Sequence, residues 1–166
     1  MSNPIAAFPA PGHDHRQCVA ALLTVAERLC NARKVRLTER RRRVLEVLAE
    51  SHSAVGAYDV IDRLAERGRR PAPVTVYRAL DFLIDQGLVH RLASVNAYVA
   101  CDRPSDDHGA QFLICKRCRT VAEMSSAAVD HAIVDGAGAA GFDISAPVVE
   151  VAGLCLNCRR ETGDGR

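Results

Sequence analysis

Hydrophobic residues recur at helical spacing in four segments of the first half of the chain. The segments are residues 18–33, a stretch after Thr38, a stretch from about Ala57 to Gly68, and residues 74–87, which end at Gly87. Thr38 has the side chain of a helix N-cap, and the two glycines suit helix C-termini. The apolar faces are positions 19, 22, 23, 26 and 29, then Val44, Leu45, Val47 and Leu48, then Val60, Ile61 and Leu64, then Leu80, Leu83 and Ile84.

The period changes after the fourth predicted helix. The stretch "LVHRLASVNAYVAC" predicts two short strands on either side of a turn at Ser94–Asn96. Helices followed directly by a β-hairpin are the plan of a winged helix-turn-helix domain. The fourth helix would be the recognition helix and the hairpin the wing.

The second half has a different pattern. "AQFLIC" and "TVAEM" predict strands, a helix is expected from about Ser125 that loosens into Gly and Ala, and "FDISAPVVEVAGLC" predicts a third strand. The fold class is therefore α+β, a winged helix-turn-helix domain followed by a small α/β domain. The expected boundaries are a flexible tail over 1–17, the first domain over 18–100, the second over 101–158, and a disordered tail over 159–166.

Composition and charge fit a soluble protein with two kinds of partner. Of 166 residues, 48% are hydrophobic and 4% aromatic, with no Trp. No run of 18 apolar residues predicts a membrane span and the N-terminus does not resemble a secretory signal, so we expect a cytoplasmic protein that binds no membrane. Residues 1–96 hold 15 Lys and Arg against 10 Asp and Glu, whereas residues 97–166 hold 7 against 10. The basic half favours nucleic acid as its partner.

The strongest chemical signal is a pair of C-x-x-C motifs. "CKRC" supplies Cys115 and Cys118, and "CLNC" supplies Cys155 and Cys158. Disulfides are rare in a reducing compartment, and four thiolates suit tetrahedral Zn²⁺. A redox dithiol or chance cysteines are the alternatives, but a redox motif normally opens a helix in a βαβ unit and needs no second pair.

A weaker set consists of His90, Cys101, His108 and Glu123. Two imidazoles, one thiolate and one carboxylate also suit Zn²⁺. Taken one at a time, each residue has an ordinary explanation as a strand or loop side chain, so spacing alone leaves this site open.

Arginines are concentrated in the first half. Arg40, Arg41, Arg42 and Arg43 run along the second predicted helix, and Arg69, Arg70 and Arg78 lie near the fourth. Tyr77 and Arg78 stand where a recognition helix meets base edges, and some of the other arginines would hold phosphates. The alternative is a trihelical domain that binds protein. No Ser/His/Asp arrangement, phosphate-cradling Gly loop or carboxylate pair favours an enzyme or a small-molecule substrate.

The stretches "RLTERRRRVL", "AYDVIDRL", "TVYRALDFLIDQGLVHRL", "NAYVAC", "FLICKRC" and "GLCLNC" resemble, in that order, the ferric uptake regulator family, most closely its zinc uptake regulator branch. The resemblance covers residues 18 to 158. It implies a winged-helix domain, a C-terminal α/β dimerisation domain, and a homodimeric repressor that binds double-stranded operator DNA when loaded with zinc.

Carried over by position, the resemblance implies two Zn²⁺ per subunit. Cys115, Cys118, Cys155 and Cys158 match structural ligands, and His90, Cys101, His108 and Glu123 match regulatory ligands. Tyr58 and Arg78 match base-contacting positions; with Thr75, Tyr77, Arg70 and Arg41 they make up the expected DNA contacts. Iron-sensing members carry a His-rich cluster before the first C-x-x-C motif, and this chain has a single His there. An iron or peroxide sensor of the same family, and a zinc-ribbon interaction protein without an operator, remain the alternatives.

Overall fold

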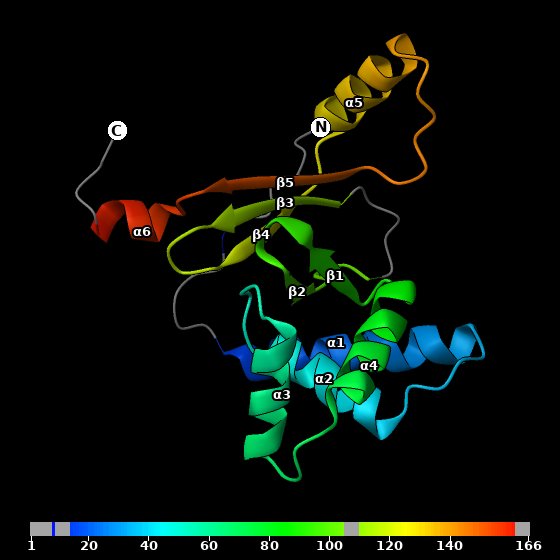
Figure 1. Ribbon diagram of the computed structural model, residues 1–166, viewed down its shortest axis with the longest axis vertical. Coiled ribbons are helices and arrows are strands. Elements are labelled where there is room, and N and C mark those ends of the chain that lie inside the picture. Colours follow the sequence, from blue (N-terminus) through cyan, green and yellow to red (C-terminus); the bar gives the residue numbers. More distant parts are fainter. Residues whose placement is uncertain (1–7, 9–13, 105–109, 162–166) are drawn as a thin grey trace. The chain divides into compact units, whose positions relative to one another are not determined.

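The computed structural model describes residue 8 and residues 14–104 and 110–161, and these divide into two compact units. The N-terminal unit consists of residues 14–104, and the C-terminal unit of residues 110–161 together with Phe8. Residues 101–104 thus group with the N-terminal unit, whereas the sequence placed them in the second domain. Both helices and sheets are present (Figure 1), and no helix among the described residues is long and apolar enough to cross a membrane.

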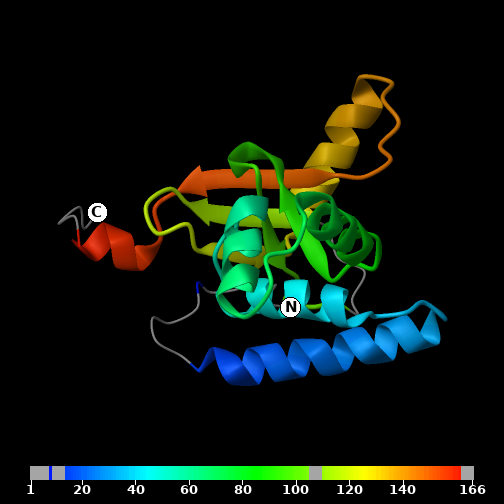
Figure 2. The same ribbon diagram turned by 60° about the horizontal axis from the view of Figure 1, so that its bottom comes forward.

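The N-terminal unit contains the four predicted helices and the hairpin. α1 lies along α2 in both views (Figures 1 and 2), and α2 also packs against α3 and α4. The elements are α1 (His15–Ala32), α2 (Glu39–Ala49), α3 (Ala57–Glu66), α4 (Pro73–Asp85), β1 (Val89–Leu92), a short 3-10 turn η1 (Ala93–Val95) and β2 (Ala97–Ala100). α1 begins three residues before the predicted start at Cys18.

Local chemistry fixes where these helices begin and end. Thr38 is the N-cap of α2, as predicted, and its hydroxyl accepts a hydrogen bond from the Arg41 N–H. At the end of α4, Gly87 has a φ of 68°, which lets the Leu88 N–H reach back to the Leu83 carbonyl at 2.9 Å. The chain therefore leaves α4 in a fixed direction and enters the hairpin at once.

The core of this unit is aliphatic. The side chains of Leu45, Leu48, Ile61, Leu80 and Leu83 are completely buried, each contributing about 1.5–3 kcal/mol of burial free energy. Cys30 is buried in the same cluster and packs there as a small hydrophobic residue.

The hairpin is antiparallel with a regular register. Val89 pairs with Ala100, His90 with Val99, and Arg91 with Tyr98. Asn96, with a φ of 46°, adopts the left-handed conformation that closes the turn. An isolated bridge between Val55 and Tyr98 attaches the hairpin to the segment that precedes α3.

The C-terminal unit is a three-stranded sheet with two helices. β3 (Ala110–Cys115) is the central strand, antiparallel to β4 (Val121–Met124) and parallel to β5 (Val148–Gly153). α5 (Ala127–Ala139) connects β4 to β5, and α6 (Leu156–Glu161) follows β5. α5 continues across Gly136 and Gly138, where the sequence predicted loosening, and α6 was not predicted and includes residues expected as tail.

Candidate metal centres and DNA-binding surface

The two C-x-x-C motifs meet in the C-terminal unit. Cys115 ends β3 and Cys155 follows β5, and because the two strands are parallel their carboxyl ends lie together (Figure 1). The Lys116 N–H donates to the Gly153 carbonyl at 2.8 Å and closes this end of the strand pair. Cys118 lies in the turn after β3 and Cys158 in α6. All four Sγ atoms lie within 4.8 Å of one another.

This arrangement fits one tetrahedral metal ion. Zinc–sulfur bonds of about 2.3 Å in a tetrahedron place the sulfurs about 3.8 Å apart. The Cys118 and Cys155 Sγ atoms lie 3.7 Å apart. Of the four side chains, Cys118 is exposed and the other three are buried. A site with four protein ligands and no open position is typical of structural zinc.

The thiols of this cluster differ in acidity. Burial would raise the pKa of Cys115, but backbone N–H groups of Cys155, Cys118 and Arg117 donate to its sulfur and lower the pKa to about 6. The Cys155 N–H···Sγ distance is 3.4 Å. Burial and the neighbouring thiols raise the pKa of Cys158 to about 12. One thiolate is thus stabilised by the fold, and a cation is needed before all four can ionise together.

Phe8 takes part in this site although nothing in the sequence pattern pointed to it. It lies in the segment expected to be a flexible tail, yet its side chain packs against buried Cys115, Cys155 and Cys158. An isolated aromatic residue between prolines carries no periodic signal, so only the fold reveals this contact. Phe8 covers part of the sulfur cluster with apolar surface.

The hairpin brings together two residues of the second predicted set. His90 pairs with Val99, so Cys101, two residues further on, projects from the same face and is the diagonal neighbour of His90. The Cys101 N–H donates to the Leu88 carbonyl at 3.0 Å and continues the ladder. A ring nitrogen of His90 and the Cys101 Sγ lie within 4.8 Å, and Cys101 is 2% exposed. The pair can supply one imidazole and one thiolate to a metal.

The other two members of that set come from the second half of the chain. Glu123 belongs to β4 of the C-terminal unit, where it pairs with Phe112 and is 4% exposed. Burying a carboxylate is costly without a compensating cation or hydrogen bonds. His108 lies outside the described residues.

Asp102, which follows Cys101, lies in a polar cluster with His52 and His15 that the sequence did not predict. The Asp102 carboxylate lies 3.6 Å from His52 Nδ1, and the His52 ring lies 5.3 Å, centre to centre, from the His15 ring of α1. These residues are far apart in sequence, and no spacing rule connects them.

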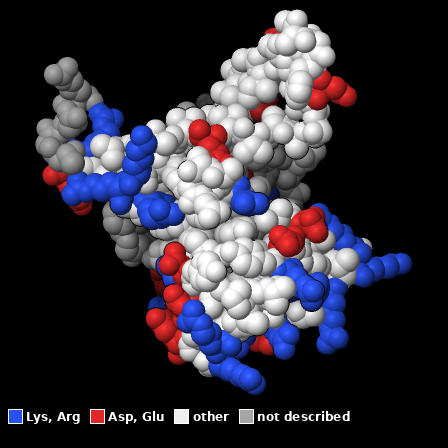
Figure 3. Space-filling view, viewed as in Figure 1, with Lys and Arg blue, Asp and Glu red and all other residues white. Residues whose placement is uncertain are grey.

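The outer face of α4 presents the residues expected to meet DNA. Val76, Ala79, Leu80 and Leu83 face the core, which leaves Val74, Tyr77 and Arg78 exposed on the opposite side. Tyr58, in the first turn of α3, is 64% exposed. Thr75 is half-buried. Figure 3 shows basic side chains projecting from the unit that carries α3 and α4.

The fold separates the consecutive arginines of α2 by role. The Arg41 guanidinium lies 3.5 Å from the centre of the Phe82 ring and donates to the Arg36 carbonyl. Arg42 pairs with Glu46 at 3.2 Å and with Glu27 of α1. Arg41 and Arg42 thus hold helices together, and Arg40 is exposed.

Three comparisons with known proteins bear on this geometry. The model of the ferric uptake regulator family matches residues 32–152. The zinc uptake regulation protein of Escherichia coli (strain K12) is 41% identical over 140 residues, covering 82% of this chain and 81% of that protein. A zinc uptake regulator complexed with zinc and DNA matches with 38% identity and a TM-score of 0.83, covering 87% of this chain and 97% of its own. The crystal structure of holo XcZur matches with 43% identity and a TM-score of 0.76, covering 86% and 99%.

Proposed function

This chain belongs to the ferric uptake regulator family, and we propose that it is a zinc-sensing repressor that binds operator DNA of zinc-uptake genes as a homodimer. The similarity to zinc uptake regulators, one of them in complex with zinc and DNA, supports this function. The family and the structural relatives are transcription regulators, and we infer that this chain is a cytoplasmic regulator with no enzymatic activity and no small-molecule substrate.

The observation that carries the choice of zinc is the His90–Cys101 pair. Its thiolate is a soft ligand. Soft ligands favour zinc, whereas harder cations favour oxygen ligands. We propose that His90, Cys101, His108 and Glu123 bind the regulatory zinc. Because this ligand set draws on both units, zinc occupancy and operator binding would be coupled, and the coupling is reciprocal: operator DNA would tighten zinc binding by the same factor.

A second zinc would be structural. We assign it to Cys115, Cys118, Cys155 and Cys158, on the strength of the 3.7 Å sulfur separation and the closed ligand set. When bound, it would supply the charge that lets four neighbouring thiolates coexist and would attach α6 to the ends of β3 and β5. Each subunit would therefore hold two zinc ions.

The C-terminal unit carries the support for a homodimer. Within the described residues α5 buries none of its side chains, and β5 is an edge strand with exposed Val148 and Val151. Phe142, in the connection between them, is 69% exposed. In Figure 3 the arm formed by α5 and this connection shows almost no basic side chains. An exposed apolar edge of this kind invites aggregation unless it is covered, and we propose that a second copy of this chain covers it.

We propose that α4 enters the major groove. Tyr77 and Arg78 lie on its outer face, and Tyr58 is exposed at the start of α3. Thr75 and Arg70 would contact the backbone. Arg41, whose guanidinium lies over the Phe82 ring, would contact the DNA from that position.

The test is metal content and operator binding across a series of buffered free-zinc concentrations. Wild type should hold two zinc ions per chain and bind the operator only at the higher zinc levels. Cys101→Ala should keep its fold and one zinc per chain but lose zinc-dependent binding, whereas Cys18→Ala, on α1, serves as the matched control. A Cys101→Ala variant with a normal zinc response would refute the regulatory site.

Tighter activation by iron than by zinc would favour an iron sensor, and weak, sequence-independent binding that ignores zinc would favour a zinc-ribbon interaction protein.

A further inference from the structure

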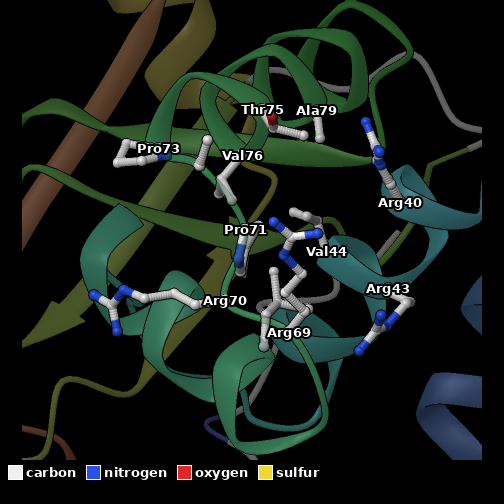
Figure 4. A pocket seen from close by; sticks show the side chains of 12 residues that line it. Arg40, Arg43, Val44, Arg69, Arg70, Pro71, Pro73, Thr75, Val76 and Ala79 are labelled. Carbon is white, nitrogen blue, oxygen red and sulfur yellow. The ribbon is translucent and has the colours of Figure 1, made fainter.

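A basic pocket lies beside the recognition helix, at its N-terminal end. Its volume is about 630 Å³, and its walls come from α2, the end of α3, the turn at 69–72 and the first turns of α4 (Figure 4). Four arginines line it: Arg40, Arg43, Arg69 and Arg70. In Figure 4, Arg40 and Arg43 come from α2 on one side, Arg70 lies on the other, and Arg69 reaches toward Val44 and Pro71 between them.

The charge of this pocket is mostly uncompensated. No Asp or Glu is among the residues that line it. Arg70 pairs with Asp62 of α3 at 2.7 Å, and Arg43 donates to the Arg67 carbonyl at 3.4 Å. Within the part of the chain that the structure describes, Arg40 and Arg69 form no ion pair with a carboxylate. Neighbouring guanidinium groups repel one another, so an anion that entered the pocket would relieve this repulsion.

The walls favour an anion with several acceptor oxygens. Guanidinium groups bind phosphate oxygens through paired N–H donors. Pro71 and Pro73 stiffen the wall, and α4 begins at Pro73, so the positive end of its dipole faces this region. Ala72, the N-cap of α4, provides no side chain to satisfy the N–H groups of the first turn.

The pocket continues toward the DNA-contacting face of α4. A smaller hollow is lined by Thr38, Arg40, Arg41, Thr75, Arg78 and Ala79, and it shares Arg40, Thr75 and Ala79 with the larger one. Arginines therefore line both neighbouring hollows, from Arg69 in the larger one to Arg78 in the smaller one. A ligand that reaches Arg78 with its bases would pass its backbone along this path.

We propose that this pocket binds a phosphate of the DNA backbone, with Arg40, Arg43 and Arg69 as its ligands. The inference rests on the proposed DNA-binding function and adds three arginines to the expected contacts. A backbone contact fixes the position of α4 in the groove without reading sequence.

The experiment measures operator affinity of the zinc-loaded protein over a salt series. Arg40→Ala and Arg69→Ala remove exposed side chains, so the fold should be retained, and Arg28→Ala on α1 is the matched control because Arg28 is exposed and lines neither hollow. The slope of log K against log salt is negative, and each lost phosphate contact should make it shallower by about 1, or by about 2 in a dimer with two pockets. At 0.15 M salt this corresponds to a loss of roughly 30-fold per dimer. Zinc dependence and preference for the operator over other sequences should not change.

Three other results are distinguishable. Variants that match Arg28→Ala in slope, and that bind inorganic pyrophosphate as wild type does, would overturn the pocket. A wild type that binds pyrophosphate and an Arg69→Ala variant that does not, with unchanged operator slopes, would assign the pocket to a free phosphate compound and overturn the DNA contact. A wild type with no zinc-dependent operator binding would instead refute the proposed function, and the slopes on non-operator duplex DNA would still test the pocket.

Discussion

Replacing Cys115 with Ala should unfold the C-terminal unit or dissociate the dimer. Backbone N–H donors lower the pKa of the Cys115 thiol to about 6, and this side chain is 1% exposed at the end of the central strand. Its removal leaves three sulfurs and an empty position in a site that otherwise has four protein ligands. The loss acts on β3, β5 and α6 together, because the cluster lies where their ends meet.

The expected loss of folding stability is large because few other buried side chains stabilise this unit. Its large buried apolar side chains are Phe112, Ile114 and Val121, which contribute about 5–9 kcal/mol of burial free energy before the cost of ordering the chain. A structural zinc contributes about 10–16 kcal/mol in small zinc domains, or about 2.5–4 kcal/mol for each of four ligands. Because small domains have net stabilities near the lower end of about 5–15 kcal/mol, losing one ligand removes most of the margin.

The assay combines zinc content, far-ultraviolet circular dichroism and sedimentation velocity on purified full-length protein. Cys115→Ala should lose the zinc that wild type retains against a mild chelator, lose strand signal and sediment as a monomer or aggregate. Cys18→Ala should match wild type in all three measurements, which controls for the loss of a thiol as such. A Cys115→Ala protein that remains dimeric and folded, with unchanged zinc content, would refute the assignment of this cluster.

Three further predictions test other parts of the structure. Burial and adjacent thiols raise the pKa of Cys158 to about 12, and burial raises the pKa of Cys155. Both thiols must therefore release a proton when zinc binds, so acidification from pH 8 to 7 should lower the zinc affinity of the four-cysteine site by at least about 100-fold. Competition with a zinc indicator measures this affinity, and a pH-independent value would contradict the assignment. Phe8→Ala should leave zinc content unchanged but speed zinc transfer to a chelator several-fold, because the ring packs against three of the cysteines, and equal transfer rates for Phe8→Ala and wild type would show that the ring gives no protection. Phe142→Asp places a charge on a side chain that is 69% exposed, so the fold should persist while sedimentation shows a monomer; an unchanged dimer would mean that this surface is not the interface.

The N-terminal unit was largely predictable because its patterns are long and consistent. α2 and α4 each bury residues at helical spacing, and Thr38 and Gly87 mark the beginning of α2 and the end of α4. The hairpin was predictable from two short stretches with strand-like composition on either side of the turn at Ser94–Asn96. The side of the hairpin on which His90 and Cys101 meet depends on register, and a one-residue shift would have separated them.

The C-terminal unit was less predictable because its signals are short or contradictory. Gly136 and Gly138 each disfavour a helix by about 1 kcal/mol relative to Ala, yet α5 continues through them with alanines at 137 and 139. α6 has six residues, too few to show a period, and it forms beside the sulfur cluster that its own Cys158 helps to build. The parallel pairing of β3 with β5 is a contact between residues about 38 positions apart in sequence, which no local pattern encodes.

The arginine run of α2 shows why charge alone overstates the DNA-binding surface. Successive residues of a helix are about 100° apart, so four consecutive arginines point in four directions. Once Thr38 fixes where the helix begins, Arg42 faces Glu27 of α1 and Arg41 faces the Phe82 ring of α4. Only Arg40 and Arg43 remain to line the pocket beside α4. The salt dependence of operator binding should therefore indicate fewer phosphate contacts than the number of Lys and Arg residues in 1–96. Part of that positive charge stabilises helix packing and is already paired with carboxylates before DNA binds.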